Sequence, residues 1–354
     1  MKRNYGILKP KLNPKDWRVG GETGIQYKEV LSTGDWTPYL PVYEKQSGNI
    51  DDMACVSHSL TDVLEIQFKR AIANNEIPQT HLDWLKNNGY FLNGEVNFSD
   101  RALAKMSNTT HQGNWNATVA ETARTVGLVP ESDWALDFTS WDIFYAEVPA
   151  ELQKKAAEFL KYFKISYMWV QQGQWGDENL SKENLANWLK VAPLQADVPV
   201  CSGWSSGEVQ PCGSRVTQHA IAIFKIVKQN CVKILDHYLP FIKNLGWLYP
   251  TDWTMLILVE PIVATPAPVV PHYTLTKDLY FGNRNDDVRK LQEELIYLSL
   301  LKSGLNTGYY GELTRLAVLA FLKKYSVTSK IWIVINNGKY VGKLTRDKLN
   351  NMFK

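Results

Sequence analysis

The chain has 354 residues, of which 45% are hydrophobic and 21% are charged, a composition typical of folded globular domains and unlike that of disordered chains. It contains no stretch of about 18 consecutive apolar residues, so we expect no membrane-spanning helix. The formal net charge is +3, but residues 277–354 alone carry 14 Lys and Arg against 7 Asp and Glu. This basic end indicates an anionic partner such as nucleic acid or a bacterial wall polymer, or simply a solvated basic surface.

The first residues, "MKRNYGILKPKLNPKDW", begin with basic side chains but lack an apolar core behind them. We therefore expect no secretory signal, synthesis in the cytoplasm, and extracellular action only after lysis or packaging in a particle. The four cysteines, Cys55, Cys201, Cys212 and Cys231, form no Cys-x-x-Cys pair, so we expect no structural zinc and no cofactor. Cys201 and Cys212 either close a loop disulfide or remain free thiols.

Helical patterns come first along the chain. Apolar side chains recur at helical spacing from Cys55 to about Asn74. Residues 99–107, 116–127 and 149–163 also read as helices, and Asn116 is placed to cap the second of these.

Strand patterns follow. "HAIAIFKIV" at 219–227 is suited to a buried strand, "KQN" can turn the chain, and "CVKILDHY" at 231–238 continues as a second strand. "DWTMLILVE" at 252–260 makes a third. Helices followed by strands predict an α+β fold whose two halves face each other across a cleft.

A segment rich in Pro, Ala and Val then separates two domains. Its prolines favour an extended spacer, so we expect a first domain at 1–260, a linker at 261–276 and a second domain at 277–354. Amphipathic patterns predict three helices in the second domain, with a small hairpin turning through Asn336–Gly338 before the last.

Cys55 stands at the start of the predicted helix 55–74. Unpaired backbone N–H groups and the helix dipole favour a thiolate there, although a cysteine at this position can also be a small packed side chain. His219, at the mouth of a strand, is a candidate base, and Asp236, in the next strand, can orient its imidazole. Separately they could be a strand-end histidine and a turn aspartate; together they favour a nucleophile, a base and an orienting group.

Several stretches resemble papain-like cysteine peptidases in their divergent bacterial and phage form. "ACVSHSLTDVLE" looks like the active-site helix, "QHAIAIFKIV" like the histidine strand, and "ILDHYLP" stands where the family has Asn-Ser-Trp. The lead-in segments "YGILKPKLNPKDW" and "LPVYEKQSGN" and the stretch from Phe98 to Trp134 are also similar, so the resemblance covers roughly residues 5–260. It implies a two-lobed domain with a helical lobe and a β-barrel-like lobe.

The resemblance also implies a role for individual residues. Cys55 would be the nucleophile, His219 the base and Asp236 the orienting group, with Tyr238 in the place of the tryptophan that shields this pair. Gln46 would supply the oxyanion-hole side chain together with the backbone N–H of Cys55.

Two features of the resemblance concern the surroundings of these residues. Gly113 would lie in the backbone strip that pairs with an extended substrate. Gln46 precedes Cys55 by nine positions, where the family spacing is about six. Either the intervening loop has grown, or Gln46 is not the oxyanion donor.

Two further histidines lie near the candidate site in sequence. His58 is one helical turn after Cys55, but that spacing offers no obvious third partner, so we interpret it as structural or pocket-lining. His237 should point to the opposite face of its strand from Asp236.

The second domain strongly resembles the peptidoglycan-binding domain type 1. The family pattern is met at Gly282, Val288, Leu291, Gln292, Gly308, Gly311, Thr314, Ala317, Val318 and Phe321. Most of these residues build the fold and not a ligand site. We expect Tyr309, Tyr310 and Arg315 to be exposed and name them as candidate ligand contacts.

These resemblances imply a cysteine-dependent amide-bond hydrolase directed at the bacterial cell wall, such as a phage endolysin or a wall-degrading enzyme of a phage particle. The expected partners are peptidoglycan or another wall polymer and a peptide substrate, with no nucleic acid, no metal and a monomeric state. The alternatives are a protein-directed peptidase anchored at the wall, and an inactive binding or structural protein on the same fold.

Overall fold

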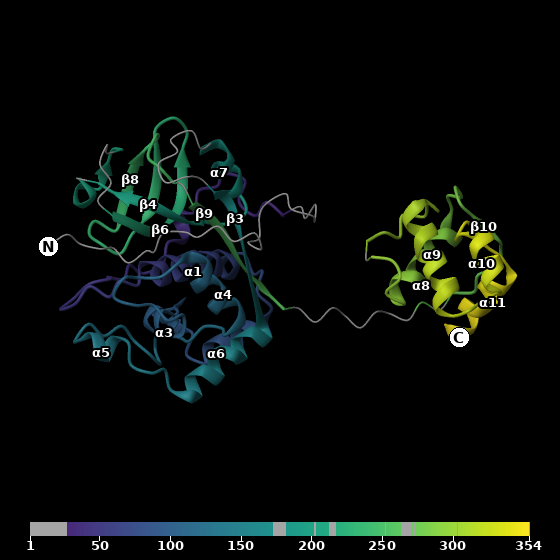
Figure 1. Ribbon diagram of the computed structural model, residues 1–354, viewed down its shortest axis with the longest axis horizontal. Helices are drawn as coiled ribbons and strands as arrows, with labels where there is room; N and C mark the ends of the chain where they lie inside the picture. The colour runs from purple at the N-terminus through teal and green to yellow at the C-terminus, as the bar shows by residue number, and fades with distance from the viewer. Residues whose placement is uncertain are drawn as a thin grey trace. The chain divides into compact units, whose positions relative to one another are not determined.

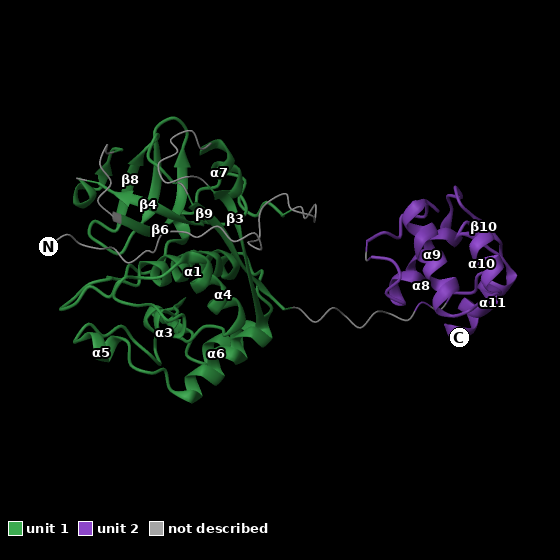
Figure 2. Cartoon of the chain, viewed as in Figure 1, with its two compact units in different colours: residues 1–263 green, residues 264–354 purple. Residues whose placement is uncertain are grey.

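The computed structural model describes residues 27–172, 182–201, 203–211, 217–251, 253–262, 271, 273–302 and 304–353. The chain divides into two compact units, residues 1–263 and 264–354, shown in separate colours in Figure 2. Most of the predicted linker and the amino-terminal lead-in segment lie outside the described residues. Among the residues described, no helix is both long and apolar enough to cross a membrane.

Unit 1 has a helical layer and a sheet layer, with one long helix between them (Figure 1). Its helices are α1 Cys55–Ala73, α2 Gln79–Asn87, α3 Asp100–Met106, α4 Asn116–Thr125, α5 Trp141–Phe144, α6 Ala150–Tyr162 and α7 Lys182–Trp188. A 3₁₀ turn at Thr37–Tyr39 and a two-stranded ribbon, β1 Phe91–Leu92 with β2 Glu95–Val96, complete this part. The predicted helices at 55–74, 99–107, 116–127 and 149–163 are present as α1, α3, α4 and α6.

Helix α1 is buried on both sides. It contacts the sheet strands β4 (Leu194–Val200), β6 (Thr217–Val227) and β9 (Trp253–Pro261), as well as α3 and α4. Apolar side chains such as Val56 and Leu60 meet the core, while the polar side chains of His58 and Glu65 are buried too. A helix that is inaccessible all round its circumference cannot fray without opening the core, which makes α1 a rigid platform for its first residue.

The described residues of the sheet form seven strands in the order β3-β9-β4-β6-β7-β8-β5. The strands not yet given bounds are β3 Phe163–Gln172, β5 Glu208–Val209, β7 Cys231–Leu235 and β8 Ile242–Gly246. All neighbouring strands run antiparallel except β5 and β8, which are parallel. Helix α1 covers one face of the central strands, and consecutive side chains of β6 are buried on both faces. For this reason "HAIAIFKIV" reads as a continuous apolar run.

The β6–β7 hairpin brings two predicted site residues to the same end. Leu235, the last residue of β7, pairs with Ala222, and Asp236 therefore lies level with the first residues of β6, which include His219. On its other edge, His219 pairs with Val198 of β4. His219 is thus held in the middle of the sheet and not on a loop.

The start of α4 departs from the sequence-based expectation at one residue. Asn116 is the first helical residue and not the cap, which is Trp115 without a side-chain hydrogen bond. The Asn116 amide instead donates to Oδ1 of Asp197 across the core at 2.6 Å. Gly127 follows the helix at φ +97°, where an added Cβ would lie 1.8 Å from the Ala156 carbonyl oxygen.

Unit 2 consists of small helices around its own core. Its elements are β10 Leu279–Tyr280, α8 Asp286–Tyr297, α9 Glu312–Lys324, α10 Lys330–Asn336, β11 Tyr340–Val341 and α11 Lys343–Met352. The three predicted helices are present as α8, α9 and α11. The hairpin predicted through Asn336–Gly338 is wrong: the apolar residues before it form α10, and β11 pairs with β10. Ser329 caps α10 by accepting from Trp332 N–H, a signal the β-branched run obscures.

The cysteines fall into two classes. Cys201 is disulfide-bonded, so the free-thiol alternative is wrong for this residue. Cys55 and Cys231 carry free thiols. Cys212 lies outside the described residues.

Candidate active site

Cys55 is the first residue of α1 and is completely buried. The backbone of Ala220, the residue after His219, hydrogen-bonds the thiol. Burial raises the pKa of the Cys55 thiol well above its usual value, the Ala220 hydrogen bond lowers it, and the carboxylates of Asp197 and Asp52 raise it again. In these surroundings a thiolate needs a positive charge beside it, which a protonated histidine can supply.

His219 and Asp236 are in direct contact. Nε2 of His219 lies 2.6 Å from Oδ1 of Asp236, and both side chains are fully buried. Burial alone would raise the pKa of Asp236, but the charges and hydrogen bonds of His219 and Lys243 hold it well below its usual range. Asp236 is therefore an ionised hydrogen-bond acceptor that fixes the ring of His219.

Two residues of this cluster were missed in the sequence. Trp204 Nε1–H donates to Oδ2 of Asp236 at 2.8 Å, and its ring meets that of His219 edge-on at 5.7 Å. Lys243 Nζ lies 2.7 Å from the same oxygen. Trp204 stands in the cysteine-flanked loop and Lys243 in an unremarkable strand, so no local motif identifies either one.

Tyr238 lies beside the pair. Its ring centre is 5.4 Å from that of His219, and its hydroxyl donates to both carboxylate oxygens of Asp51 at 2.8 Å. Burial, followed by the negative charge of Asp51, raises the pKa of Tyr238 well above its usual range, so the hydroxyl remains a donor. Tyr238 thus ties the histidine side of the cluster to the loop that precedes α1.

The loop before α1 explains the long spacing between Gln46 and Cys55. Ser47 and Asp51 form an antiparallel bridge, and the Asp52 N–H returns to the Gln46 carbonyl at 3.2 Å. Residues 47–51 therefore form a closed loop, and Gln46 is hydrogen-bonded to Asp52, three residues before the start of α1. Its side chain is fully buried, and among the described residues neither amide atom has a hydrogen-bond partner. A buried amide without a partner is uncommon in folded proteins and calls for an explanation.

Gly113 lies in a tight turn with φ +93°. Its N–H donates to the Thr110 carbonyl at 2.8 Å, and its own carbonyl accepts from Thr110 N–H at 3.3 Å. Both of its backbone groups are engaged inside the turn, so the geometry does not favour Gly113 itself as a strand partner for a substrate.

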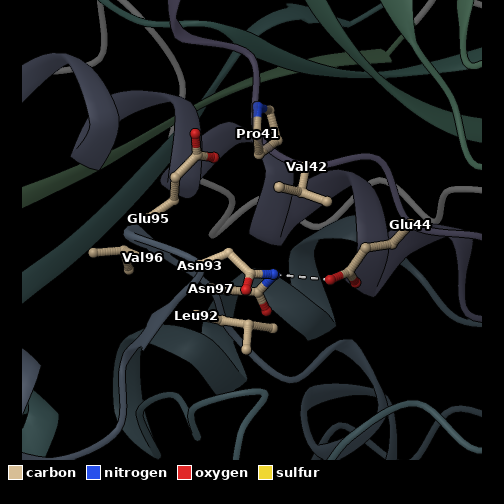
Figure 3. A pocket seen from close by; sticks show the side chains of 8 residues that line it. All are labelled: Pro41, Val42, Glu44, Leu92, Asn93, Glu95, Val96 and Asn97. Carbon is tan, nitrogen blue, oxygen red and sulfur yellow. Dashed lines mark hydrogen bonds between the residues drawn. The ribbon is translucent and has the colours of Figure 1, made fainter.

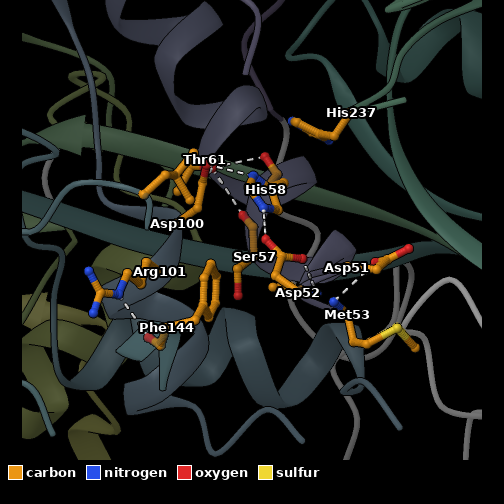
Figure 4. A network of polar contacts seen from close by, with 12 residues as sticks. Asp51, Asp52, Met53, Ser57, His58, Thr61, Asp100, Arg101, Phe144 and His237 are labelled. Atoms are coloured by element: carbon orange, nitrogen blue, oxygen red, sulfur yellow. Dashed lines mark hydrogen bonds and ion pairs between the residues drawn. The ribbon is translucent and has the colours of Figure 1, made fainter. Parts of the chain in front are cut away.

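A buried polar network lies under the first turn of α1 (Figure 4). His58 Nε2 lies 2.7 Å from Oδ2 of Asp52, and its Nδ1 lies 2.6 Å from Oδ2 of Asp100. Burial alone would lower the pKa of His58, but the two carboxylates raise it well above its usual value. Asp52 in turn accepts from Ala54 N–H at 2.8 Å. No partner for His58 was evident from the sequence; the structure shows two, which make it a structural cation.

The second nearby histidine also faces a carboxylate. His237 Nε2 lies 3.1 Å from Oδ2 of Asp62, and its ring centre is 4.6 Å from that of His58. Its side chain therefore points towards α1, away from the Asp236 carboxylate. Neither histidine is positioned as an alternative base for Cys55.

Further acidic side chains extend this network towards a surface pocket. Burial and the negative charge of Asp100 raise the pKa of Glu44 to about 10 and that of Glu131 to about 8. Glu44, His58 and Asp100 offer ligand atoms within 4.8 Å of one another, and protonated His58 supplies the positive charge there. Glu44 also accepts from the Asn97 amide at 2.8 Å (Figure 3). The lining of this pocket is Pro41, Val42, Glu44, Leu92, Asn93, Glu95, Val96 and Asn97. It includes none of the predicted catalytic residues.

The three predicted contacts of unit 2 differ in accessibility. Tyr309 is 39% exposed, and the Arg284 guanidinium lies 4.8 Å from its ring centre. Tyr310 is fully buried and donates its hydroxyl to the Gly338 carbonyl at 2.8 Å, so its expected exposure is wrong. Its ring belongs to the core of unit 2. Arg315 is paired with Glu312 and donates to the Asn337 carbonyl, so its guanidinium is largely engaged.

Comparison with known proteins bears on the fold. No family model and no curated protein sequence matches the chain. Xylellain, a cysteine protease from Xylella fastidiosa, matches with a TM-score of 0.50 and 14% identity over 72% of this chain and 96% of its own. Procathepsin B S9 from Trypanosoma congolense matches with a TM-score of 0.48 and 10% identity over 74% and 88%. The mixed α+β architecture and the similarity to xylellain show that the chain carries the papain-like cysteine protease fold.

Proposed function

We propose that unit 1 is a cysteine-dependent amide-bond hydrolase that acts on the bacterial cell wall. One observation carries the catalytic part. His219 is paired with Asp236 in the buried interior, and the backbone of the next residue, Ala220, hydrogen-bonds the Cys55 thiol. A nucleophile on a helix, a base on a strand and a fixed acceptor behind the base are the three parts that acyl transfer needs.

In the first half of the proposed reaction, the Cys55 thiolate attacks the carbonyl carbon of the scissile amide. A C–S bond forms, and the carbonyl oxygen becomes negative. The unpartnered amide N–H of Gln46 and the backbone N–H of Cys55 stabilise this oxyanion. When the C–N bond breaks, protonated His219 gives its proton to the leaving amine, and a thioester remains on Cys55.

In the second half, a water molecule gives a proton to His219 and attacks the thioester carbonyl. The C–S bond breaks, a carboxylic acid leaves, and the Cys55 thiolate is restored beside protonated His219. Asp236 keeps the ring of His219 in one orientation through both halves, because Nε2 is held at 2.6 Å. The rings of Trp204 and Tyr238 cover this contact and exclude water from it.

We further propose that unit 2 binds the wall polymer and holds unit 1 at its substrate. The residues from 277 to the end carry a net charge of +7, which suits an anionic polymer, and Tyr309 with Arg284 presents an exposed aromatic and cationic surface. Tethering raises the effective concentration of unit 1 at the wall. In this proposal the protein reaches the wall by lysis or as part of a phage particle.

The test uses purified peptidoglycan and, separately, a denatured protein as substrates. The parent chain, Cys55→Ala and the matched thiol control Cys231→Ser are incubated with each, and new amine and carboxyl ends are identified by mass spectrometry. Wall fragments released by the parent and by Cys231→Ser, but not by Cys55→Ala, support the proposal. Cleavage of denatured protein alone redirects it to a protein-directed peptidase. Absence of any product that depends on Cys55 overturns the hydrolase assignment.

A further inference from the structure

The carboxylate of Asp236 accepts four hydrogen bonds. Oδ1 accepts from Nε2 of His219 at 2.6 Å and from the His237 backbone N–H at 2.7 Å. Oδ2 accepts from Nε1 of Trp204 at 2.8 Å and lies 2.7 Å from Nζ of Lys243. All of these partners are donors, so only an ionised carboxylate satisfies the position. An asparagine here would turn an NH₂ group towards either one pair of donors or the other.

Lys243 is built into this arrangement from the neighbouring strand. It belongs to β8, is fully buried, and donates to the carbonyls of Tyr238 and Pro240 at 2.5 Å each as well as to Asp236. All three ammonium donors are thus used. Removing a lysine charge from water costs several kcal/mol unless a partner compensates for it. A side chain that only filled space at this position of β8 would not require a charge.

The charge has a chemical consequence at His219. A lone buried carboxylate at 2.6 Å would hold the imidazolium proton tightly and hinder its transfer to a leaving amine. A cation 2.7 Å from the same carboxylate opposes this pull. The ion pair then presents His219 with a strong hydrogen-bond acceptor of little net charge.

We propose that Lys243 is a positioning residue that neutralises Asp236, so that the pair orients His219 without trapping its proton. This inference rests on the proposed roles of Cys55 and His219. Among the described residues, the carboxylates of Asp197 on β4 and of Asp51 and Asp52 on the loop before α1 act on Cys55. His237 with Asp62 forms a separate pair on the α1 side. Lys243 therefore supplies the positive charge that pairs with Asp236, whereas the charged groups that act on the thiol are acids.

The test follows the pH profile of Cys55 alkylation by iodoacetate, with the label assigned to Cys55 by peptide mapping. The parent for this test is Cys231→Ser, which removes the second free thiol. Iodoacetate is an anion, so its reaction slows where the imidazolium next to the thiolate loses its proton. This alkaline limb reports on His219 and requires no substrate.

Three variants separate charge from packing. Lys243→Met keeps the length of the side chain without its charge, and the alkaline limb is expected to move up by about one pH unit, as a unit charge several Å away requires. Lys243→Arg keeps the charge and changes the shape, and its limb should stay in place even if the rate falls. Asp236→Asn with Lys243→Met removes both charges, and its limb should lie near that of the parent.

Each outcome decides the proposal. An alkaline limb that is unchanged in Lys243→Met, or that moves equally in Lys243→Arg, assigns the residue to packing and overturns the inference while leaving the proposed function standing. If Lys243→Met does not fold, the double variant decides: a limb at the position of the parent supports the inference, and a displaced limb overturns it. A parent in which Cys55 titrates as an isolated thiol would overturn both the inference and the proposed function.

Discussion

Nε2 of His219 lies 2.6 Å from Oδ1 of Asp236, and neither side chain is accessible to solvent. His219 lies near the start of β6, and Asp236 directly follows β7, the strand that forms a hairpin with β6. Two strands that are hydrogen-bonded along their length fix its geometry, so substrate binding is not required to assemble it. Changes around this pair are therefore expected to alter catalysis more than folding.

Replacing Trp204 by phenylalanine should weaken this cluster moderately. Trp204→Phe keeps an aromatic ring edge-on to His219 and removes only the N–H that Asp236 accepts at 2.8 Å. We expect kcat/KM for amide hydrolysis to fall by about 10- to 100-fold, the effect of one hydrogen bond to a charged group. Trp84→Phe, whose indole stacks on Tyr162, serves as the control and should retain the rate of the parent. Equal losses in both variants would contradict the specific role of Trp204.

Replacing Gln46 by alanine should reduce activity without a matching loss of stability. Its amide is buried, and among the described residues it has no hydrogen-bond partner, so its removal breaks no bond of the folded state. We expect kcat to fall about 100-fold or more with little change in KM, as for other oxyanion donors. The free energy of unfolding should change by less than about 1 kcal/mol.

A second buried glutamine provides the comparison for Gln46. Gln195 donates to the Val56 carbonyl and to Ser59 Oγ at 2.8 Å each. Gln195→Ala removes both of these bonds from the core and should lower the free energy of unfolding by about 1–3 kcal/mol. If Gln46→Ala proves the less stable of the two, Gln46 is a structural residue and the oxyanion assignment is lost.

Unit 2 should lose stability as the pH rises because of one carboxyl group. Burial raises the pKa of Glu294 to about 8, above its value in an unfolded chain, so the folded state holds an extra proton between about pH 4.5 and 8. The free energy of unfolding should therefore decrease by up to about 1.4 kcal/mol per pH unit across this window. Glu294→Gln mimics the protonated form and should flatten the curve. Denaturation of unit 2 at several pH values measures the slope, and parallel curves for the two proteins would refute the assignment.

A pair of glycines separates backbone strain from steric clash. Gly127 and Gly94 both have positive φ, at +97° and +88°. At Gly127 an added Cβ would lie 1.8 Å from the Ala156 carbonyl oxygen, whereas at Gly94 it meets no atom within 4 Å. Gly94→Ala should cost about 1–2 kcal/mol of stability from the left-handed conformation alone. Gly127→Ala should cost at least about 3 kcal/mol, because α6 must also move. Thermal denaturation of the two variants checks this order. Equal losses of stability would mean that α6 moves aside at no energetic cost.

Much of the fold was predictable from local patterns. The apolar spacing after Cys55 and the continuous run after His219 gave α1 and β6, since burial on a helix face or in a sheet imposes those periods. The contact between His219 and Asp236 followed from the hairpin turn between their strands. Sequence patterns failed at α10, where β-branched residues predicted strand structure and the serine cap before them decided for a helix.

The missing parts of the candidate site depend on contacts between distant segments. Lys243 and Trp204 reach Asp236 from separate parts of the chain, and neither carries a motif of its own. The partners of His58 were missed for the same reason, because Asp100 comes from α3. Tyr310 was expected on the surface, but its ring lies in the core.

The burial of α1 on both sides links activity to the integrity of the whole of unit 1. Side chains of α1, of the sheet and of the helical layer belong to one continuous apolar core. Neither layer can melt and leave the other intact, so the unit should denature as a single cooperative transition. The catalytic rate would then be a reporter of global folding, lost at the same temperature as the core and recovered only with it.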